Sequence, residues 1–215
     1  SGYLGWSLFL YNGDREQIGK TELTQGTASV TIPEQGFDPG TFYIQVKTNA
    51  MTNGNWSGAE QYTLTADFTP TDSTYESEPN DSTSRADVML PNTPVSGKLS
   101  DESDVDYYKV TLDSAAQFSL CLEHALPDDL SSSGTPWTVT CYPFDEKTGT
   151  LREDKAVTLD AALGKTKTES ETVLVRGGTY YVEVRHKGIG GFSDLEYTLT
   201  MQAEMLTYTK GDANA

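Results

Sequence analysis

The sequence predicts an all-β protein made of two tandem antiparallel β-sandwiches of jelly-roll type, the first incomplete at its N-terminus. Short segments in which apolar and polar residues alternate, bounded by Gly, Asn and Pro, recur along the chain. Alternation with a period of two indicates half-buried antiparallel strands, and several such strands at regular spacing are typical of a sandwich. No helical period is sustained, and only residues 159–163 suggest a turn of helix.

An internal repeat divides the chain into two related units. The first copy reads GWSLFLY (5–11), DPGTFYIQVKT (38–48) and EQYTLTADF (60–68). The second copy keeps this order, with PWTVTCY (136–142), RGGTYYVEVRH (176–186) and LEYTLTMQA (195–203). We therefore expect the same three strands in each unit.

The stretch between the two copies is rich in Pro, Ser, Thr and Asp, a composition that indicates a linker. The predicted organisation is a first sandwich at 1–70, an acidic linker at 71–81, a second sandwich at 82–206 and a terminal segment at 207–215. Because Ser1 corresponds to Ser133, the first copy lacks the counterpart of residues 76–132. A half sandwich with unpaired edges is unstable. We therefore expect further residues ahead of Ser1 in the native protein.

The chain is strongly acidic, since its 215 residues include 15 basic and 32 acidic side chains and carry a net charge of −17. Affinity for phosphate depends on Lys and Arg, so this balance opposes binding to nucleic acid or to anionic membranes. No apolar run approaches the roughly 18 residues of a membrane span, and we expect no membrane insertion. Abundant Asn, Thr, Ser, Gly and Tyr favour a secreted bacterial β-protein.

The sequence contains no recognisable catalytic motif. His124 and His186 lie far apart, and there is no G-x-S-x-G, H-E-x-x-H or Gly-rich phosphate loop. We therefore expect a protein that is not an enzyme. Cys121 and Cys141 differ in strand parity relative to their apolar neighbours, which favours buried free thiols and leaves a disulfide as the alternative.

Hard oxygen donors gather in two short segments, and these are the candidate metal ligands: Glu76, Glu78, Asn80, Asp81, Asp101, Asp104 and Asp106. A Ca²⁺ ion takes about 6–8 oxygen ligands and tolerates irregular geometry, so two acidic clusters on crossing segments suit it. Neither segment contains Cys or His, which argues against zinc and copper. The alternative is a solvated acidic linker.

The pattern E-x-E-P-N-D followed by D-x-D-Y-Y resembles the bacterial pre-peptidase C-terminal (PPC) domain, a family that includes the collagen-binding domains of clostridial collagenases. The resemblance covers residues 76–204. It implies a β-sandwich in which Ca²⁺ is held by Glu76, Glu78, Asn80, Asp81, Asp101 and Asp104. Asp106 matches the D-x-D of the family, where it either binds the ion or caps a turn. The motif lies where the two units join, so we expect calcium to order the linker.

The last residues, YTKGDANA, resemble the beginning of a dockerin. Gly211, Asp212 and Asn214 match the opening of its calcium loop, G-D-x-N-x-D-G. An ordinary polar tail is the alternative. The resemblance implies a cohesin partner and a cellulosome-like or starch-degrading assembly (an amylosome) on the surface of an anaerobic bacterium.

Aromatic side chains provide the candidate surface for a polysaccharide, since a flat ring packs against the apolar face of a sugar. Trp56 lies in a Gly/Asn-rich loop and Phe192 in the matching loop, where a hydrophobic lid is the alternative. Trp6 and Trp137 are further candidates, although their parity favours core packing. The outward parity of Tyr43 and Tyr181 predicts either a stacking surface, with Lys47 and Arg185 beside them, or ordinary amphipathic tyrosines.

These features together predict a non-catalytic polysaccharide-binding protein of a dockerin-assembled extracellular complex. Its resemblance to dockerin-linked proteins of starch-degrading gut bacteria favours starch-type α-glucan, or maltooligosaccharide, as the ligand. One alternative is a Ca²⁺-dependent collagen- or protein-binding domain, for which Tyr181 is the candidate residue. Another is a spacer beside a secreted hydrolase, stiffened by Ca²⁺.

Overall fold

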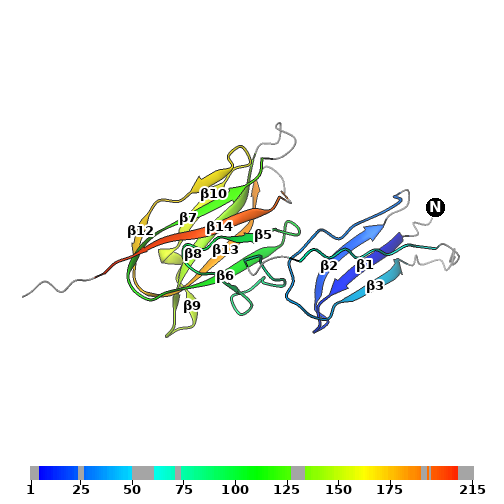
Figure 1. The fold of residues 1–215 in the computed structure, drawn as a ribbon, viewed down its shortest axis with the longest axis horizontal. Coiled ribbons are helices and arrows are strands. Elements are labelled where there is room, and N and C mark those ends of the chain that lie inside the picture. Colours follow the sequence, from blue (N-terminus) through cyan, green and yellow to red (C-terminus); the bar gives the residue numbers. More distant parts are fainter. Residues whose placement is uncertain are drawn as a thin grey trace, which may run out of the picture. The chain divides into compact units, whose positions relative to one another are not determined.

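A computed structural model of the chain describes residues 5–23, 27–49, 61–70, 74–126, 134–189, 193 and 195–207. Within these ranges the regular structure is β-strand, apart from one 3-10 turn at Glu153–Lys155 (η1) (Figure 1). The predicted all-β class is confirmed. The helical turn expected at 159–163 is wrong, because strand β10 (Val157–Ala161) covers most of it. No helix in the described ranges is both long enough and apolar enough to cross a bilayer.

The chain divides into two compact units, Ser1–Ser73 (unit 1) and Thr74–Ala215 (unit 2). The described part of unit 1 forms one antiparallel sheet in the order β2-β1-β3, with β1 at Gly5–Tyr11, β2 at Gln17–Leu23 and β3 at Tyr43–Asn49. The third expected strand, 60–68, is wrong where the structure describes it, because residues 61–70 are exposed and have no regular structure. Its counterpart in unit 2 is a strand held by neighbours on both edges.

Unit 2 is a sandwich of two sheets (Figure 1). The first sheet has the order β10-β8-β13-β6-β4, and β9 pairs with β8. Besides β10, its strands are β4 (Asp87–Val88), β6 (Val105–Leu112), β8 (Thr135–Asp145), β9 (Thr150–Leu151) and β13 (Gly178–Ile189). The other has the order β11-β7-β14-β5, with β12 on β7; its strands are β5 (Val95–Gly97), β7 (Ala116–His124), β11 (Lys167–Glu169), β12 (Val173–Val175) and β14 (Tyr197–Met205). Between these strands, only β4 and β6 pair in parallel.

The core of unit 2 lies between its two sheets and is built from alternate residues of the long strands. Trp137 and Val139 of β8 belong to it, as do Phe118 and Leu120 of β7, and all four are almost completely buried. Each such side chain stabilises the fold by about 1.5–3 kcal/mol. The core position favoured for Trp137 is confirmed, so this ring is not available to a ligand.

Cys121 and Cys141 are both buried free thiols, as the strand parity predicts. Cys141 belongs to the core of unit 2 on β8, whereas Cys121 lies on β7 in the other sheet and outside the core cluster. The alternative of a disulfide between them is therefore wrong.

The internal repeat extends to the pairing of strands. In unit 1, β1 and β3 place Tyr11 opposite Tyr43. In unit 2, the repeat counterparts β8 and β13 place Tyr142 opposite Tyr181. The other edge of β1 pairs with β2, and the other edge of β8 pairs with β10. The sheet of unit 1 is thus equivalent, strand for strand, to part of one sheet of unit 2.

The acidic segment after Ser73 belongs to unit 2. The backbone N–H of Glu76 donates to the carbonyl of Ser96 at 2.9 Å, and Tyr75 forms a β-bridge with the same residue. Glu76 and Asn80 are buried. The linker expected at 71–81 is therefore wrong from Thr74 onward, because these residues pack into the sandwich.

Candidate metal centre

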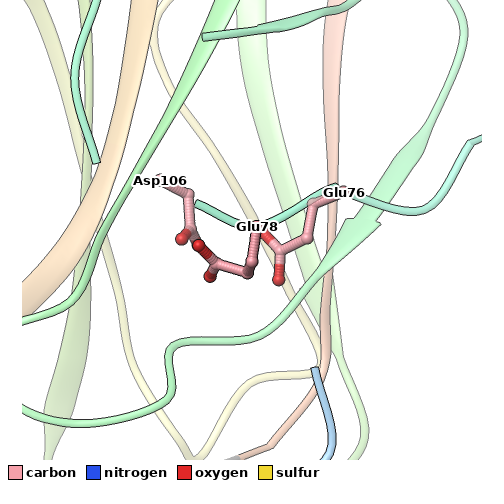
Figure 2. A group of neighbouring side chains, drawn as sticks. All are labelled: Glu76, Glu78 and Asp106. Carbon is pink, nitrogen blue, oxygen red and sulfur yellow. The ribbon is translucent and has the colours of Figure 1, made fainter. Parts of the chain in front are cut away.

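Two groups of carboxylates adjoin each other in unit 2. Glu76, Glu78 and Asp106 form the first, and their side-chain oxygens lie within 4.8 Å of one another (Figure 2). Glu78, Asp81 and Asp104 form the second, within the same distance. Glu78 belongs to both. The structure therefore brings together residues from both sequence segments that we singled out.

Two strands position these side chains. Asp106 lies near the start of β6, and the preceding segment crosses it because the N–H of Tyr107 donates to the carbonyl of Asn80 at 3.1 Å. On the other side, the N–H of Lys98, just after β5, donates to Oε1 of Glu76 at 2.6 Å. The short segment from Glu76 to Asn80 is therefore fixed between strands of the two sheets.

Two tyrosine hydroxyls form the floor of the first group. Tyr108 donates to Oε2 of Glu76 at 3.0 Å, Tyr197 donates to Asp106, and the two hydroxyl oxygens lie 2.7 Å apart. Both tyrosines are completely buried. Gly97 leaves room for them, since a Cβ there would lie 2.5 Å from Oε2 of Glu76 and 2.6 Å from the Tyr108 hydroxyl.

Three oxygens of the cluster have no hydrogen-bond donor although they are buried: Oε1 of Glu78, Oδ1 of Asn80 and Oδ1 of Asp106. Buried polar atoms are almost always paired, and an unpaired one costs about 1–3 kcal/mol. The Asn80 amide nitrogen is already used, because it donates to Glu76 and to Asp87 at 3.4 Å each. All three free atoms are hard oxygen acceptors, the donor type that Ca²⁺ prefers.

The clustered carboxyls have raised pKa values. Burial, followed by repulsion from Asp104, raises the pKa of Glu78 from 4.5 to about 9. Burial is also the main reason that the pKa of Glu76 rises to about 7 and that the pKa of Asp106 lies well above its ordinary value. Without a cation, some of these carboxyls therefore hold a proton at neutral pH. A positive charge bound among them would reverse the shifts.

Asp101 is the predicted carboxylate ligand that lies outside both groups. It is exposed, and its carboxylate accepts hydrogen bonds from the backbone N–H of Ser103 at 2.7 Å and from the Ser103 hydroxyl at 2.6 Å. This is a turn-capping contact, and a role of Asp101 as a ligand stays a prediction. Turn capping was the alternative for Asp106, which lies in the buried cluster instead.

The aromatic candidates in the described residues differ in their exposure. Tyr43 is 45% exposed, as its parity predicts, whereas Tyr181 is only 7% exposed. The stacking role expected for Tyr181 is wrong, because the Phe144 ring packs edge-on against it with 5.4 Å between centroids. Trp6 is partly buried, and its ring packs against the Tyr62 ring with 5.3 Å between the ring centroids.

Lys47 and Arg185 are exposed, and Arg185 forms an ion pair with Glu183 at 3.2 Å. Trp56, Phe192 and the dockerin-like residues Gly211, Asp212 and Asn214 lie outside the described residues.

Sequence reasoning missed the residues that support the cluster, Tyr108, Tyr197 and Gly97. A signal for Tyr108 was present, because Asp106 and Tyr108 have the same parity in the D-x-D-Y-Y run and so point to the same side of β6. Tyr197 comes from β14 and Gly97 from β5. Their proximity depends on how the two sheets pack, which alternation along one strand does not specify.

Comparison with known proteins gives a fold neighbour and no family assignment. No family model matches the chain, and no curated protein matches it. One similar solved structure is the pre-peptidase C-terminal domain of collagenase from Bacillus anthracis, with 16% sequence identity and a TM-score of 0.41. The similarity covers 54% of this chain and 94% of the collagenase domain.

Proposed function

We propose that unit 2 is a Ca²⁺-stabilised, non-catalytic accessory module of a secreted protein. The observation that carries this proposal is that three buried acceptor oxygens in this region, on Glu78, Asn80 and Asp106, have no hydrogen-bond donor. A buried oxygen of this kind destabilises a fold unless a hydrogen-bond donor or a cation binds it. The described residues of the two carboxylate groups include no Cys or His, so the donor set suits a hard cation rather than zinc.

The geometry offers two adjoining cation positions that share Glu78. The inner position is bounded by Glu76 and Asp106, both buried. The outer position is bounded by Asp104 and the exposed Asp81, which gives it access to solvent. Bound Ca²⁺ supplies positive charge and fills the free coordination of these oxygens. The chain itself supplies a cage whose Glu76 and Asp106 are oriented by the tyrosine floor.

Calcium titration of the full chain after EDTA treatment tests this function. Wild-type protein is expected to give saturable heat in isothermal titration calorimetry. Glu78→Gln removes the charge shared by both positions and is expected to lower the affinity for Ca²⁺ at least about tenfold. Loss of a residue that only hydrogen-bonds to a metal ligand already lowers metal affinity by about that factor. Glu102→Gln is the matched control, because Glu102 is exposed and lies in neither group. Equal loss of affinity in both variants would contradict a defined site.

Polysaccharide binding is the second candidate function, and one observation favours it. Tyr43 is 45% exposed on β3 and shares a strand face with the exposed Lys47. The Arg15 guanidinium lies 5.9 Å from the centre of the Tyr43 ring, so charged groups capable of binding hydroxyls adjoin the aromatic face. Starch-type α-glucan stays the favoured target by resemblance. The cohesin partner and the cell-surface assembly also stay predictions, because they depend on residues outside the described ranges.

Titrations with maltoheptaose, a cello-oligosaccharide and a collagen-model peptide separate the ligand classes. If Tyr43 stacks on α-glucan, maltoheptaose is the one ligand of the three that binds. Tyr43→Ala should then lower the affinity for maltoheptaose about tenfold or more, as expected for a hot-spot aromatic residue. Phe68→Ala is a suitable control, because Phe68 is also an exposed aromatic residue but lies outside the sheet. Binding of the peptide alone would instead support a protein-binding module, and no binding to any of them would support a spacer.

A further inference from the structure

Strand β14 of unit 2 pairs with β7 along its whole length but with β5 over only part of it. Tyr197–Met205 lie opposite residues of β7, whereas β5 lies opposite Tyr197–Leu199. Beyond Leu199, the backbone groups of β14 that point away from β7 need another partner. A strand edge that lacks one is a template for pairing with a second chain.

A turn between β4 and β5 brings Asn92 to this part of the edge. The backbone N–H of Thr93 donates to the carbonyl of Leu90 at 3.2 Å, and Asn92 has a φ of 62°. Pro91 at the second position of the turn and a positive φ at the third are features of a type II turn, which favours Gly or Asn there. Met89, just before the turn, is buried in the core and anchors it.

The side-chain amide of Asn92 binds the backbone of Ala203 as a residue of a neighbouring strand would. Its Nδ2 donates to the carbonyl of Ala203 at 2.8 Å, and the N–H of Ala203 donates to its Oδ1 at 2.8 Å. The backbone N–H of Asn92 donates in addition to the carbonyl of Met201 at 2.9 Å. Opposed residues of an antiparallel pair exchange the same two hydrogen bonds. One exposed side chain therefore takes the place of a strand residue at this edge.

The β14 strand of a second copy fits the same edge. With Ala203 opposite Ala203, each copy donates the N–H that Asn92 otherwise binds to the carbonyl of the other copy. In this antiparallel register Gln202 of one copy lies opposite Glu204 of the other, and Met201 lies opposite Met205. Like charges directly opposite each other would destabilise such a pair, and this register contains none.

We propose that the edge of β14 is a surface for self-association and that the side chain of Asn92 closes it. The partner is a second copy of this chain, joined through an antiparallel β14–β14 pair centred on Ala203. Asn92 occupies the N–H and the carbonyl that the second copy needs, and so keeps the two chains apart. Neither Asn92 nor Ala203 belongs to the carboxylate groups, so calcium binding and self-association are separate properties.

Asn92→Gly in the full chain tests whether the side chain closes the edge. Glycine adopts the positive φ of the turn without strain, so this change isolates the two hydrogen bonds of the amide. In dilute protein, the backbone amide of Ala203 is expected to exchange its hydrogen at least about tenfold faster than in the wild type. The amide of Gln202 points toward β7 and serves as the internal control. Unchanged exchange at Ala203 in a monomeric variant overturns the proposal.

Analytical ultracentrifugation of the same two proteins tests the partner. Asn92→Gly is expected to form dimers as its concentration rises, over a range in which the wild-type chain stays a monomer. In the dimer the amide of Ala203 should be protected from exchange again. An Asn92→Gly protein that stays monomeric throughout, or equal self-association of both proteins, overturns the proposal.

A charge exchange at Gln202 tests the register. Added to Asn92→Gly, Gln202→Glu places a carboxylate opposite Glu204 and is expected to weaken the dimer several-fold. Gln202→Lys places an opposite charge there and is expected to strengthen the dimer by a similar factor. Because Gln202 is exposed, both changes leave the packed residues in place. The same dimer affinity in both charge variants overturns the β14–β14 pair.

Discussion

Gly97→Ala is expected to destabilise unit 2 by about 1–3 kcal/mol, the usual cost of adding a methyl group to a packed interior. The added Cβ would lie within 2.6 Å of three oxygens, on Glu76, Tyr108 and Tyr197. These atoms are buried and bonded to one another, so they cannot move apart without losing hydrogen bonds. The melting temperature of unit 2 should fall by several degrees. Calcium affinity should fall with it, because Glu76 must shift.

Gly164→Ala is the matched control for this substitution. Gly164 lies in an exposed turn of unit 2, and a Cβ there would meet nothing within 4 Å. Thermal unfolding and calcium titration of the two variants separate crowding of the cluster from the general effect of replacing glycine. A Gly97→Ala protein with wild-type stability and affinity would show that the tyrosine floor does not constrain the carboxylates.

The metal-free protein is expected to lose stability as the pH rises from about 5 to 9. The pKa of Glu78 is raised to about 9 and that of Glu76 to about 7 in the folded state, against 4.5 for each as the ordinary value. Between these limits the folded chain binds more protons than the unfolded chain, so unfolding becomes more favourable as protons are removed. Melting temperatures in EDTA at pH 5, 7 and 9, at constant ionic strength, measure the trend.

Calcium should weaken or reverse this trend. The ion competes with protons for the same oxygens, so its stabilising effect grows as the pH rises. Glu78→Gln should flatten the metal-free profile, because the amide has no proton to lose, whereas Glu102→Gln should leave it unchanged. A metal-free profile that rises steadily from pH 5 to 9 would contradict the raised pKa values and their origin in burial.

Strand positions were largely predictable from the sequence because alternation is a local signal. The repeated segments at 5–11 and 136–142 are strands in both units. The segment at 60–68 shows the limit of this signal. Its pattern matches β14, yet the described residues 61–70 are not a strand, because a strand also needs partners at its edges. Alternation reports the ability to pair and contains no information on whether the partner is present.

Side-chain exposure was less predictable than strand position. Tyr43 and Tyr181 have the same parity and the same place in the repeat, but only Tyr43 is exposed. The difference comes from Phe144. Strand β8 is longer than β1 and continues past Tyr142 to include Phe144, whose ring packs on Tyr181. Parity tells which side of a sheet a residue faces, whereas neighbouring side chains decide whether that side is covered.

The sequence predicted most of the carboxylates that cluster in the structure, but it did not predict the buried tyrosines that hydrogen-bond to them. Glu76, Glu78 and Asp106 meet as expected for oxygen donors on crossing segments. Asp101 was indistinguishable from them by residue type, and only the local turn with Ser103 separates it. The buried tyrosines required knowledge of how the two sheets pack. Hydrogen bonds across the sandwich leave no short motif in the sequence.

Calcium titration of the EDTA-treated wild-type chain at neutral pH tests the central claim most directly. The claim is that the buried oxygens of Glu78, Asn80 and Asp106 are completed by a hard cation. It predicts saturable binding of one or two Ca²⁺ ions per chain, release of protons on binding, and weaker binding of Mg²⁺, which demands stricter octahedral geometry. The absence of saturable Ca²⁺ binding, in a chain shown to be folded, would contradict it.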